Sequence, residues 1–303
     1  MPAMSNATIA KLLLVALSFC WGLSWTAMRV ALDEVSPWGM RLIGYSIGAT
    51  TLLLLLKAQG RSLAIPRGKD WLHIFIAALF LSVSFGVAGT FAQLMANTSR
   101  VIIVNYSMPV WGSLMAYFVL RERINARAAL GLALCMAGLS VLVYPVAETS
   151  FREPIGLLLA LVCALGWGGG TVYMKWARIP GDLLVITAWQ IALGAVVFGA
   201  GLLVFQGMPA PAAVSLKAVL AVLYNGLLGT GFAYILWFAI IERLPTATAS
   251  LGSLSTPVVG IISSMLMLGE RPTTEDMIGF ALIFAAAACV LTQSAQRTVA
   301  QAP

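Results

Sequence analysis

The chain has 303 residues, of which 60% are hydrophobic and only 10% are charged. A water-soluble domain carries about 25% charged residues, so this composition excludes a soluble globule and requires lipid to cover much of the exterior. The net charge is +7, but the lysines and arginines are scattered between apolar runs and do not form the basic patch that nucleic acid requires.

The apolar runs predict an all-α membrane protein. A spanning helix needs about 20 apolar residues, because each residue adds about 1.5 Å against a hydrocarbon core about 30 Å thick. Runs of this length recur ten times between charged residues or Pro and Gly. They predict helices at residues 9–30, 38–57, 71–94, 100–120, 127–144, 154–174, 183–205, 214–240, 247–268 and 275–293. The first run is too long for a signal peptide, so we expect it to be retained.

The distribution of cations predicts the orientation. If the N-terminus lies inside, 12 of the 18 lysines and arginines fall in inner segments and 6 at outer helix ends. The six outer residues include Arg29, Arg41 and Arg100. An excess of Lys and Arg marks the cytoplasmic side of a membrane protein, so we expect both termini of this multi-pass chain to be cytoplasmic.

The second half of the chain repeats the first. Matching residues recur in order at an offset of 146 residues, which later becomes 148. The matched sets are Trp21-Gly22 with Trp167-Gly168, Gly48-Ala49 with Gly194-Ala195, Pro109 with Pro257, and Glu122-Arg123 with Glu270-Arg271. We expect a first repeat over residues 1–147 and a second over residues 148–303, each with five helices. Because five is an odd number, the second repeat is inverted relative to the first.

Inverted repeats are typical of secondary transporters. In such proteins the substrate site lies near the bilayer midplane, at the interface of the two repeats, and exchange of conformation between the repeats gives alternating access. A duplicated scaffold without transport is the alternative interpretation.

Several of these motifs together resemble a known family. The paired Trp-Gly motifs, the prolines Pro109 and Pro257, and the helix ends at residues 120–123 and 268–271 are similar to those of the EamA-type branch of the drug/metabolite transporter superfamily. The resemblance covers about residues 9–293. It implies ten helices in two inverted five-helix repeats around a central cavity, a bacterial inner-membrane location, and export of amino acids or related metabolites. The most similar members are the bacterial aromatic amino acid exporters.

Pro109 and Pro257 fall in the middle of predicted helices. Proline has no N–H donor, and its ring clashes with the carbonyl group four residues earlier, which frees the carbonyls of Asn105 and Ser253. In lipid a freed carbonyl needs an internal partner or a water-filled cavity. We predict that both prolines form kinks along the transport route that let the helix halves move. A kink satisfied by neighbouring helices is the alternative.

Aromatic and polar residues inside the spans are candidates for the cavity wall. Trp21 and Trp25 share one helix face, Trp21 lies far from either interface, and Trp167 is its counterpart in the second repeat. They could stack on aromatic substrates, although core packing is the alternative. The predicted cavity residues are Trp21, Trp25, Asn105, Trp167, Tyr234 and Ser253, from a cavity lined by the first, third, fourth, sixth, eighth and ninth helices. The glycine run at residues 166–170 predicts close helix packing.

The chain lacks several familiar motifs. No acidic residue lies at the centre of a predicted helix, which argues against a proton relay of the usual kind. No Walker loop and no catalytic or metal-ligand grouping is present, so we predict neither an enzyme nor a cofactor. Four cysteines lie within apolar runs, where packing is the expected role.

The sequence therefore predicts a secondary transporter that exports amino acids with aromatic or apolar side chains, or related small metabolites, by alternating access. An exporter of cationic drugs or other metabolites is the alternative. The expected partners are the amino acid and the lipid bilayer, with no nucleic acid. We expect a monomer, although the sequence leaves an oligomer open, and it does not determine the energy coupling.

Overall fold

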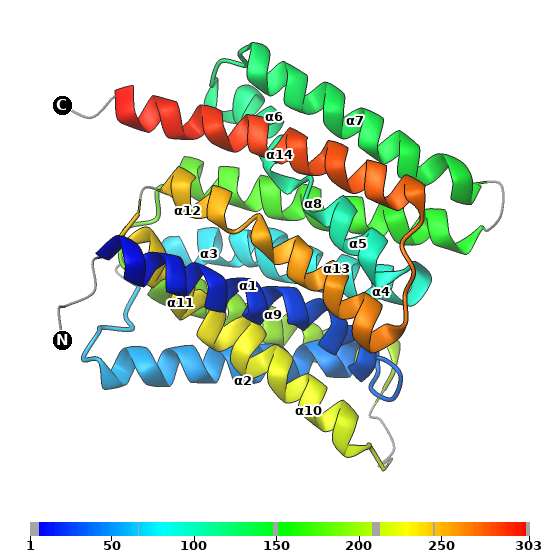
Figure 1. The fold of residues 1–303 in the computed structure, drawn as a ribbon. Coiled ribbons are helices and arrows are strands. Elements are labelled where there is room, and N and C mark those ends of the chain that lie inside the picture. Colours follow the sequence, from blue (N-terminus) through cyan, green and yellow to red (C-terminus); the bar gives the residue numbers. More distant parts are fainter. Residues whose placement is uncertain (1–5, 66, 148–150, 208–212, 245, 301–303) are drawn as a thin grey trace, which may run out of the picture.

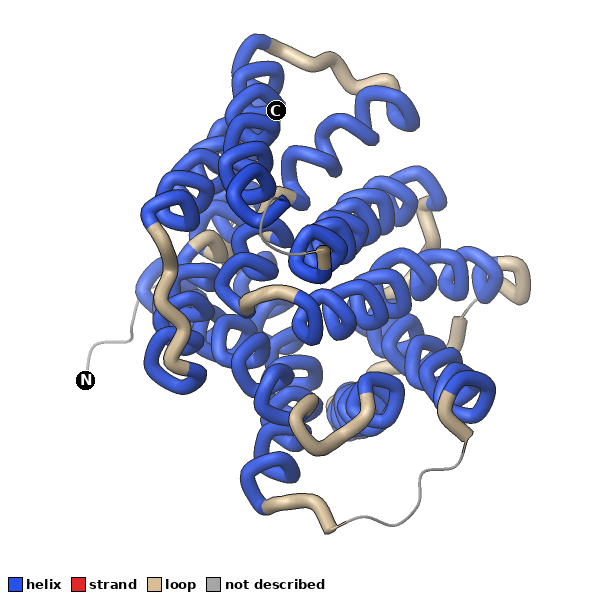
Figure 2. Tube along the Cα trace, turned by 90° about the vertical axis from the view of Figure 1, so that its right-hand side faces the viewer, coloured by secondary structure: helices blue, strands red, loops and turns tan. Residues whose placement is uncertain are grey.

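The computed structural model describes residues 6–65, 67–147, 151–207, 213–244 and 246–300, which form helices and loops with no strand (Figures 1 and 2). The elements in chain order are α1 (Asn6–Ala31), α2 (Pro37–Ala58), α3 (Asp70–Ala78), the π-helical segment η1 (Leu79–Ser84), α4 (Phe85–Met95), α5 (Thr98–Asn105), α6 (Met108–Leu120), α7 (Ala126–Ala147), α8 (Arg152–Ala177), α9 (Leu183–Phe205), α10 (Leu216–Tyr224), the π-helical segment η2 (Asn225–Phe232), α11 (Ala233–Ile241), α12 (Thr246–Gly252), α13 (Ser255–Leu268) and α14 (Thr274–Ala300).

Ten helical stretches in the described part of the chain are long and apolar enough to cross a membrane. Four of these stretches, Asp70–Met95, Thr98–Leu120, Leu216–Ile241 and Thr248–Leu268, contain more than one element. Large apolar side chains such as Val204 and Leu266 lie on the outside of the bundle, 75% and 80% exposed, where lipid can solvate them. The predicted all-α fold with ten spanning helices is confirmed, and the predicted bounds agree to within a few residues.

The ten spans form two inverted five-helix repeats that interleave. The first span, α1, packs against α13 and α11 of the second repeat, while α8 packs against α4 and α6 of the first. At the flanks α2 packs against α9, and α7 packs against α14. We call the end of the bundle where α1 begins and α14 ends the terminal end, at the left of Figure 1, and the other end the distal end.

The irregular parts of the helices also obey the repeat. The two π-helical segments begin at Leu79 and Asn225, at the 146-residue offset of the sequence matches. The left-handed residues that end α6 and α13 are Arg121 (φ 56°) and Gly269 (φ 70°), at the 148-residue offset. π-Helical insertions in α-helices often occur at functional sites, and Ser82 of η1 and Thr230 of η2 are buried in the bundle.

The two prolines stand at helix breaks rather than at kinks within a continuous helix. The fourth span is divided between α5 and α6, and the ninth between α12 and α13. Pro109 and Pro257 each lie in the first turn of the second piece, where a missing N–H leaves no helical bond unmade. Each span is therefore non-helical just before its proline: at Tyr106 and Ser107 in the fourth span, and at Ser253 and Leu254 in the ninth.

The glycine run at residues 166–170 brings α8 close to its neighbours. A Cβ atom added to Gly168 would lie 2.8 Å from the backbone nitrogen of Gly112 in α6. One added to Gly166 would lie 2.3 Å from the Ser84 hydroxyl. These contacts agree with the close packing that the sequence predicts for the run.

The predicted boundary between the repeats falls where α7 ends, and residue 148 lies outside the described residues.

Candidate substrate cavity

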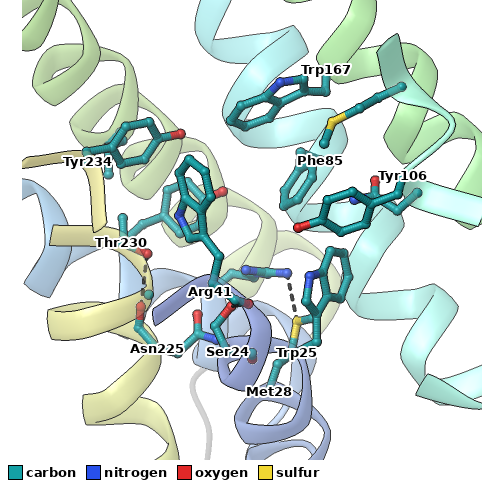
Figure 3. Close-up of a pocket in the computed structure, with 16 residues that line it drawn as sticks. Ser24, Trp25, Met28, Arg41, Phe85, Tyr106, Trp167, Asn225, Thr230 and Tyr234 are labelled. Atoms are coloured by element: carbon teal, nitrogen blue, oxygen red, sulfur yellow. Dashed lines mark hydrogen bonds between the residues drawn. The ribbon is translucent and has the colours of Figure 1, made fainter. Parts of the chain in front are cut away.

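A cavity lies between the two repeats in the middle of the bundle (Figure 3). It contains about 750 Å³ of empty space, including the part that is open to solvent. Its wall is formed by residues of α1, α2, α4, α5, α6, α8, α9, η2 and α11, and by Tyr106 at the break between α5 and α6. Residues of both repeats therefore enclose the central cavity.

Aromatic rings form much of this wall. The ring centroids of Trp25 and Phe85 are 5.7 Å apart, and those of Phe85 and Trp167 are 5.2 Å apart. On the other side, Trp21 and Tyr234 meet edge to face with centroids 6.2 Å apart. Figure 3 shows the rings of Trp25, Phe85, Trp167 and Tyr234 around one space, with Tyr234 and Trp167 on opposite sides. The wall thus offers apolar ring faces from both repeats.

The structure brings five of the six predicted cavity residues together. Trp21, Trp25, Asn105, Trp167 and Tyr234 all line the central cavity. The sixth, Ser253, lines a second cavity instead, together with Pro109. Pro257 is buried within α13 and lines neither of these two cavities.

The second cavity connects the centre to the terminal end. It shares Trp21, Met108 and Trp167 with the central cavity and reaches Glu122 and Lys175, which lie where α6 and α8 finish. A third cavity, lined by charged residues such as Arg29 and Glu270, opens at the distal end and shares no lining residue with the central cavity. The central cavity is therefore continuous with the terminal end and separate from the distal end.

Contacts between the repeats close the distal end. The Arg100 guanidinium of α5 donates to Asp276 at 2.6 Å and to Glu153 at 2.8 Å, and both carboxylates belong to the second repeat. Glu270 accepts hydrogen bonds from the backbone N–H groups of Thr98 and Ser99 at 2.6 and 2.8 Å. The first turn of α5 is thus fastened by three carboxylates from the opposite repeat.

Arg41 is the charged cavity residue among those that the predicted set omitted. It was assigned to the outer end of its helix, but it lines the central cavity and is only 5% exposed. Its Nε donates to the Gly86 carbonyl at 3.1 Å and to the Thr90 hydroxyl, and its Nη2 donates to the Met28 sulfur at 2.7 Å. An ionisable residue a full turn inside an apolar helix is a functional candidate by default, and that signal could have identified Arg41.

Two helices were also missing from the predicted wall. The predicted set omitted α2 and α9, but α2 supplies Arg41 and Tyr45 and α9 supplies Ile191. Tyr45 and Ile191 are equivalent positions of the two repeats at the 146-residue offset. The predicted ninth span does not reach the central cavity and contributes Ser250, Ser253 and Leu254 to the second cavity.

Asn105 has an unusual environment within the wall. The residue is 1% exposed, and its side-chain Oδ1 is buried with no hydrogen-bond partner. A buried acceptor without a partner carries the full desolvation penalty of about 1–3 kcal/mol. Asn225, across the cavity, is different because its amide donates to the Ser24 carbonyl at 2.9 Å.

The described residues contain no group of three or more His, Cys, Asp or Glu side chains that could hold a metal ion. The cysteines at positions 20, 135 and 163 are buried free thiols, and Cys289 is a partly buried one. The central cavity is lined by aromatic rings, hydroxyl groups, amides and the Arg41 guanidinium.

Comparison with known proteins gives a consistent result. The uncharacterized transporter YoaV of Bacillus subtilis is 28% identical over 89% of this chain and 92% of its own length. The uncharacterized protein PA1977 of Pseudomonas aeruginosa is 32% identical over 84% of this chain and 85% of its own. A protein of Escherichia coli that is named a probable amino-acid metabolite efflux pump is 22% identical over 87% of this chain and 88% of its own length. A solved crystal structure has the same fold, with a TM-score of 0.66 and 23% identity over 96% of this chain and 99% of that one.

The model of the EamA-like transporter family matches the chain twice, at residues 8–144 and at residues 154–292. Each match covers one five-helix repeat, as the repeated motifs of the sequence predict. The names of the family and of the B. subtilis and E. coli relatives describe transporters rather than enzymes. This multi-pass membrane protein therefore belongs to the EamA-like transporter family.

Proposed function

We propose that the protein is a secondary transporter that exports amino acids with aromatic or apolar side chains by alternating access. One observation carries the proposal: an aromatic-walled cavity lies between the repeats, continuous with one end of the bundle and separated from the other. A transporter needs such a central site and an exit on one side at a time.

The walls of the cavity favour an aromatic or large apolar side chain. Ring faces of Trp25, Phe85 and Trp167 can stack on a substrate ring, and such aromatic contacts contribute about 0.5–1.5 kcal/mol beyond the burial of area. The E. coli relative that is named an amino-acid metabolite efflux pump supports the same substrate class.

The charge distribution supports the direction of transport. The loops and helix ends at the terminal end hold most of the lysines and arginines, which favours a cytoplasmic position for that end and for both termini. The open side of the cavity then faces the cytoplasm of a bacterial cell, and the conformation described above is the one that an exporter uses to load its substrate.

The cavity disfavours the alternative substrate class, organic cations. The residues that line the central cavity include Arg41 but no Asp or Glu. A buried guanidinium repels a second cation in a medium of low dielectric constant. Contact with the tryptophan rings attracts such a drug, but no carboxylate of the lining neutralises its charge.

The direct test is transport by the purified protein in proteoliposomes. Uptake of labelled tryptophan or phenylalanine should be saturable and should exceed uptake by empty liposomes, and an excess of unlabelled tryptophan on the inner side should accelerate it by exchange. Measurement with and without a pH gradient shows whether protons are coupled. If folded protein carried none of the amino acids but did carry organic cations, the proposed substrate class would be wrong.

A further inference from the structure

We infer that Arg41 and Asn105 form the recognition site for the charged end of the substrate, with Arg41 binding its carboxylate and the Asn105 carbonyl oxygen accepting from its ammonium group. This inference rests on the proposed function and deepens it. It makes the cavity selective for zwitterionic α-amino acids over amines and other molecules with the same ring.

Arg41 carries a charge that the protein does not neutralise. Arginine remains protonated in proteins, and all three hydrogen-bond acceptors of Arg41, a carbonyl, a hydroxyl and a thioether, are neutral. Arg100 is equally buried, at 8% exposure against 5%, and pairs with two carboxylates. The described part of the chain offers Arg41 no such partner.

The unused donors of Arg41 suit a carboxylate. A guanidinium has five N–H groups in a fixed fork. The described contacts occupy Nε and one N–H of Nη2, which leaves both N–H groups of Nη1 and one of Nη2. Two parallel N–H donors match the two oxygens of a carboxylate in a bidentate, charge-assisted pair. Figure 3 shows the Arg41 side chain extending into the cavity, with Thr230 on one side of it and Trp25 on the other.

The energetic argument favours a ligand that brings its own negative charge. An uncompensated buried ion costs several kcal/mol even after relaxation. An entering carboxylate removes that cost, and its own desolvation is offset by the bidentate pair. Aromatic rings line the same cavity, so an organic acid fits it better than a hydrated inorganic anion does.

Asn105 supplies the complementary group. Its Oδ1 is a buried acceptor without a partner in the same cavity, and an ammonium group is a donor with no acceptor capacity. In an α-amino acid the ammonium and carboxylate groups are attached to one carbon atom, so one small molecule can satisfy a lone acceptor and a lone cation together. Neither group of the protein then remains unpaired.

The site occurs in one repeat only. At the 146-residue offset the equivalent of Arg41 is Thr187, whose hydroxyl donates to the Leu183 carbonyl within its own helix. At the 148-residue offset the equivalent of Asn105 is Ser253, which lines the second cavity. The cavity therefore has a single charged pole, which orients the substrate in one way.

The test compares ligands that differ by one charged group. Binding of labelled tryptophan to the purified protein is measured in competition with tryptamine, which lacks the carboxylate, and with indole-3-propionate, which lacks the ammonium. We expect tryptamine to bind about 30-fold more weakly than tryptophan, as the loss of a charge-assisted pair predicts. Arg41→Gln should weaken tryptophan binding about 30-fold without weakening tryptamine binding, and Arg41→Lys should restore part of the loss. Asn105→Leu should weaken tryptophan but not indole-3-propionate.

Arg243→Gln, at an exposed site near the terminal end, is the matched control and should bind like the wild type. The melting temperature of Arg41→Gln should equal or exceed that of the wild type, because the substitution removes a buried unpaired charge. This measurement distinguishes loss of binding from loss of the fold. Equal affinity for tryptophan and tryptamine, or full tryptophan binding by Arg41→Gln, would overturn the inference and leave the proposed function intact.

Other outcomes separate the two proposals. Arg41-dependent binding of indole-3-propionate without binding of any amino acid would support the carboxylate site and overturn amino acid export. Displacement of tryptophan by inorganic phosphate or chloride at equal concentration would overturn the inference in favour of a site for small inorganic anions.

Discussion

Glu270 accepts hydrogen bonds from both the backbone N–H and the hydroxyl group of Ser99, at 2.8 and 2.6 Å. Glu270 follows α13 in the second repeat, and Ser99 lies in the first turn of α5 in the first repeat. A carboxylate at a helix N-terminus is stabilised by the unpaired N–H groups and by the helix dipole. The alternating access proposed above requires the distal end to open, and these bonds would then break in each transport cycle.

The first prediction concerns this contact. Glu270→Gln removes the charge and keeps the shape, so the closed distal end should lose about 1.4 kcal/mol relative to the open one, a tenfold change in their ratio. A cysteine introduced at Ser24, in the wall of the central cavity, in a background without the native cysteines, reports the change. Its labelling by a membrane-impermeant thiol reagent from the distal side should increase about tenfold.

Glu275→Gln is the control for that experiment, because Glu275 is an exposed carboxylate at the same end of the bundle. It should leave labelling near the level of the unsubstituted protein. Unchanged labelling in Glu270→Gln, with the fold preserved, would mean that the contact with Ser99 does not hold the distal end closed.

The second prediction concerns the crossing of α6 and α8. A Cβ atom on Gly168 would lie 2.8 Å from the backbone nitrogen of Gly112, whereas one on Gly112 would lie 3.5 Å from the Cα atom of Gly168. Overpacking against backbone costs about 1–3 kcal/mol. We therefore expect Gly168→Ala to lower the melting temperature by several degrees and to reduce transport, while Gly112→Ala stays close to the wild type. Equal stability of the two variants would contradict the close approach.

The third prediction concerns the aromatic wall. Trp21→Ala removes a ring shared by the central and second cavities, and the loss of one stacking partner should raise the KM for tryptophan about tenfold. Trp176→Ala is the control, since Trp176 is 53% exposed and lines neither cavity. Transport rates and melting temperatures are measured together. An unchanged KM in Trp21→Ala would remove Trp21 from the substrate site.

The fourth prediction concerns pH and the loop before α3. Asp182 accepts from Arg61 at 2.8 Å and from the backbone N–H of Leu184 at 2.8 Å. Partial burial alone would raise the pKa of Asp182, but Arg61 and the Leu184 N–H stabilise the carboxylate more, so the pKa lies below its usual value. A lowered pKa in the folded state stabilises the protein above the unfolded value of about 3.9, and this contribution disappears as the pH falls through the folded pKa.

Asp182→Asn should therefore lower the melting temperature at pH 7 and have no effect once the pH is below the folded pKa. The side chains of Arg61 and Asp182 are 38% and 35% exposed, so solvent screens the pair and we expect a difference of only about 1–3 °C. Glu242→Gln, at an exposed carboxylate 3.9 Å from Arg243, should not change the melting temperature at any pH. A difference for Asp182→Asn that persisted at low pH would show that charge is not its cause.

The sequence determined the ten helices, the duplication and most of the aromatic wall. Each of these features depends on local composition or on spacing along the chain: the length of an apolar run sets a span, and five spans per repeat dictate inversion. Trp21 and Trp167 could be found because a repeat places equivalent residues at equivalent depths. Pro109 and Pro257 predicted kinks in two helices, and the structure has helix breaks just before both prolines instead.

Only the tertiary structure decided which polar groups meet across the repeats. The sequence does not show which cation finds a carboxylate partner. Arg100 is neutralised by Asp276 and Glu153 of the other repeat, whereas Arg41 faces the cavity among neutral partners. The Glu270 contact with Ser99 joins residues 171 positions apart. Such pairings depend on how helices rotate and pack against one another, and the period of a single helix carries no information about the face that its partner presents.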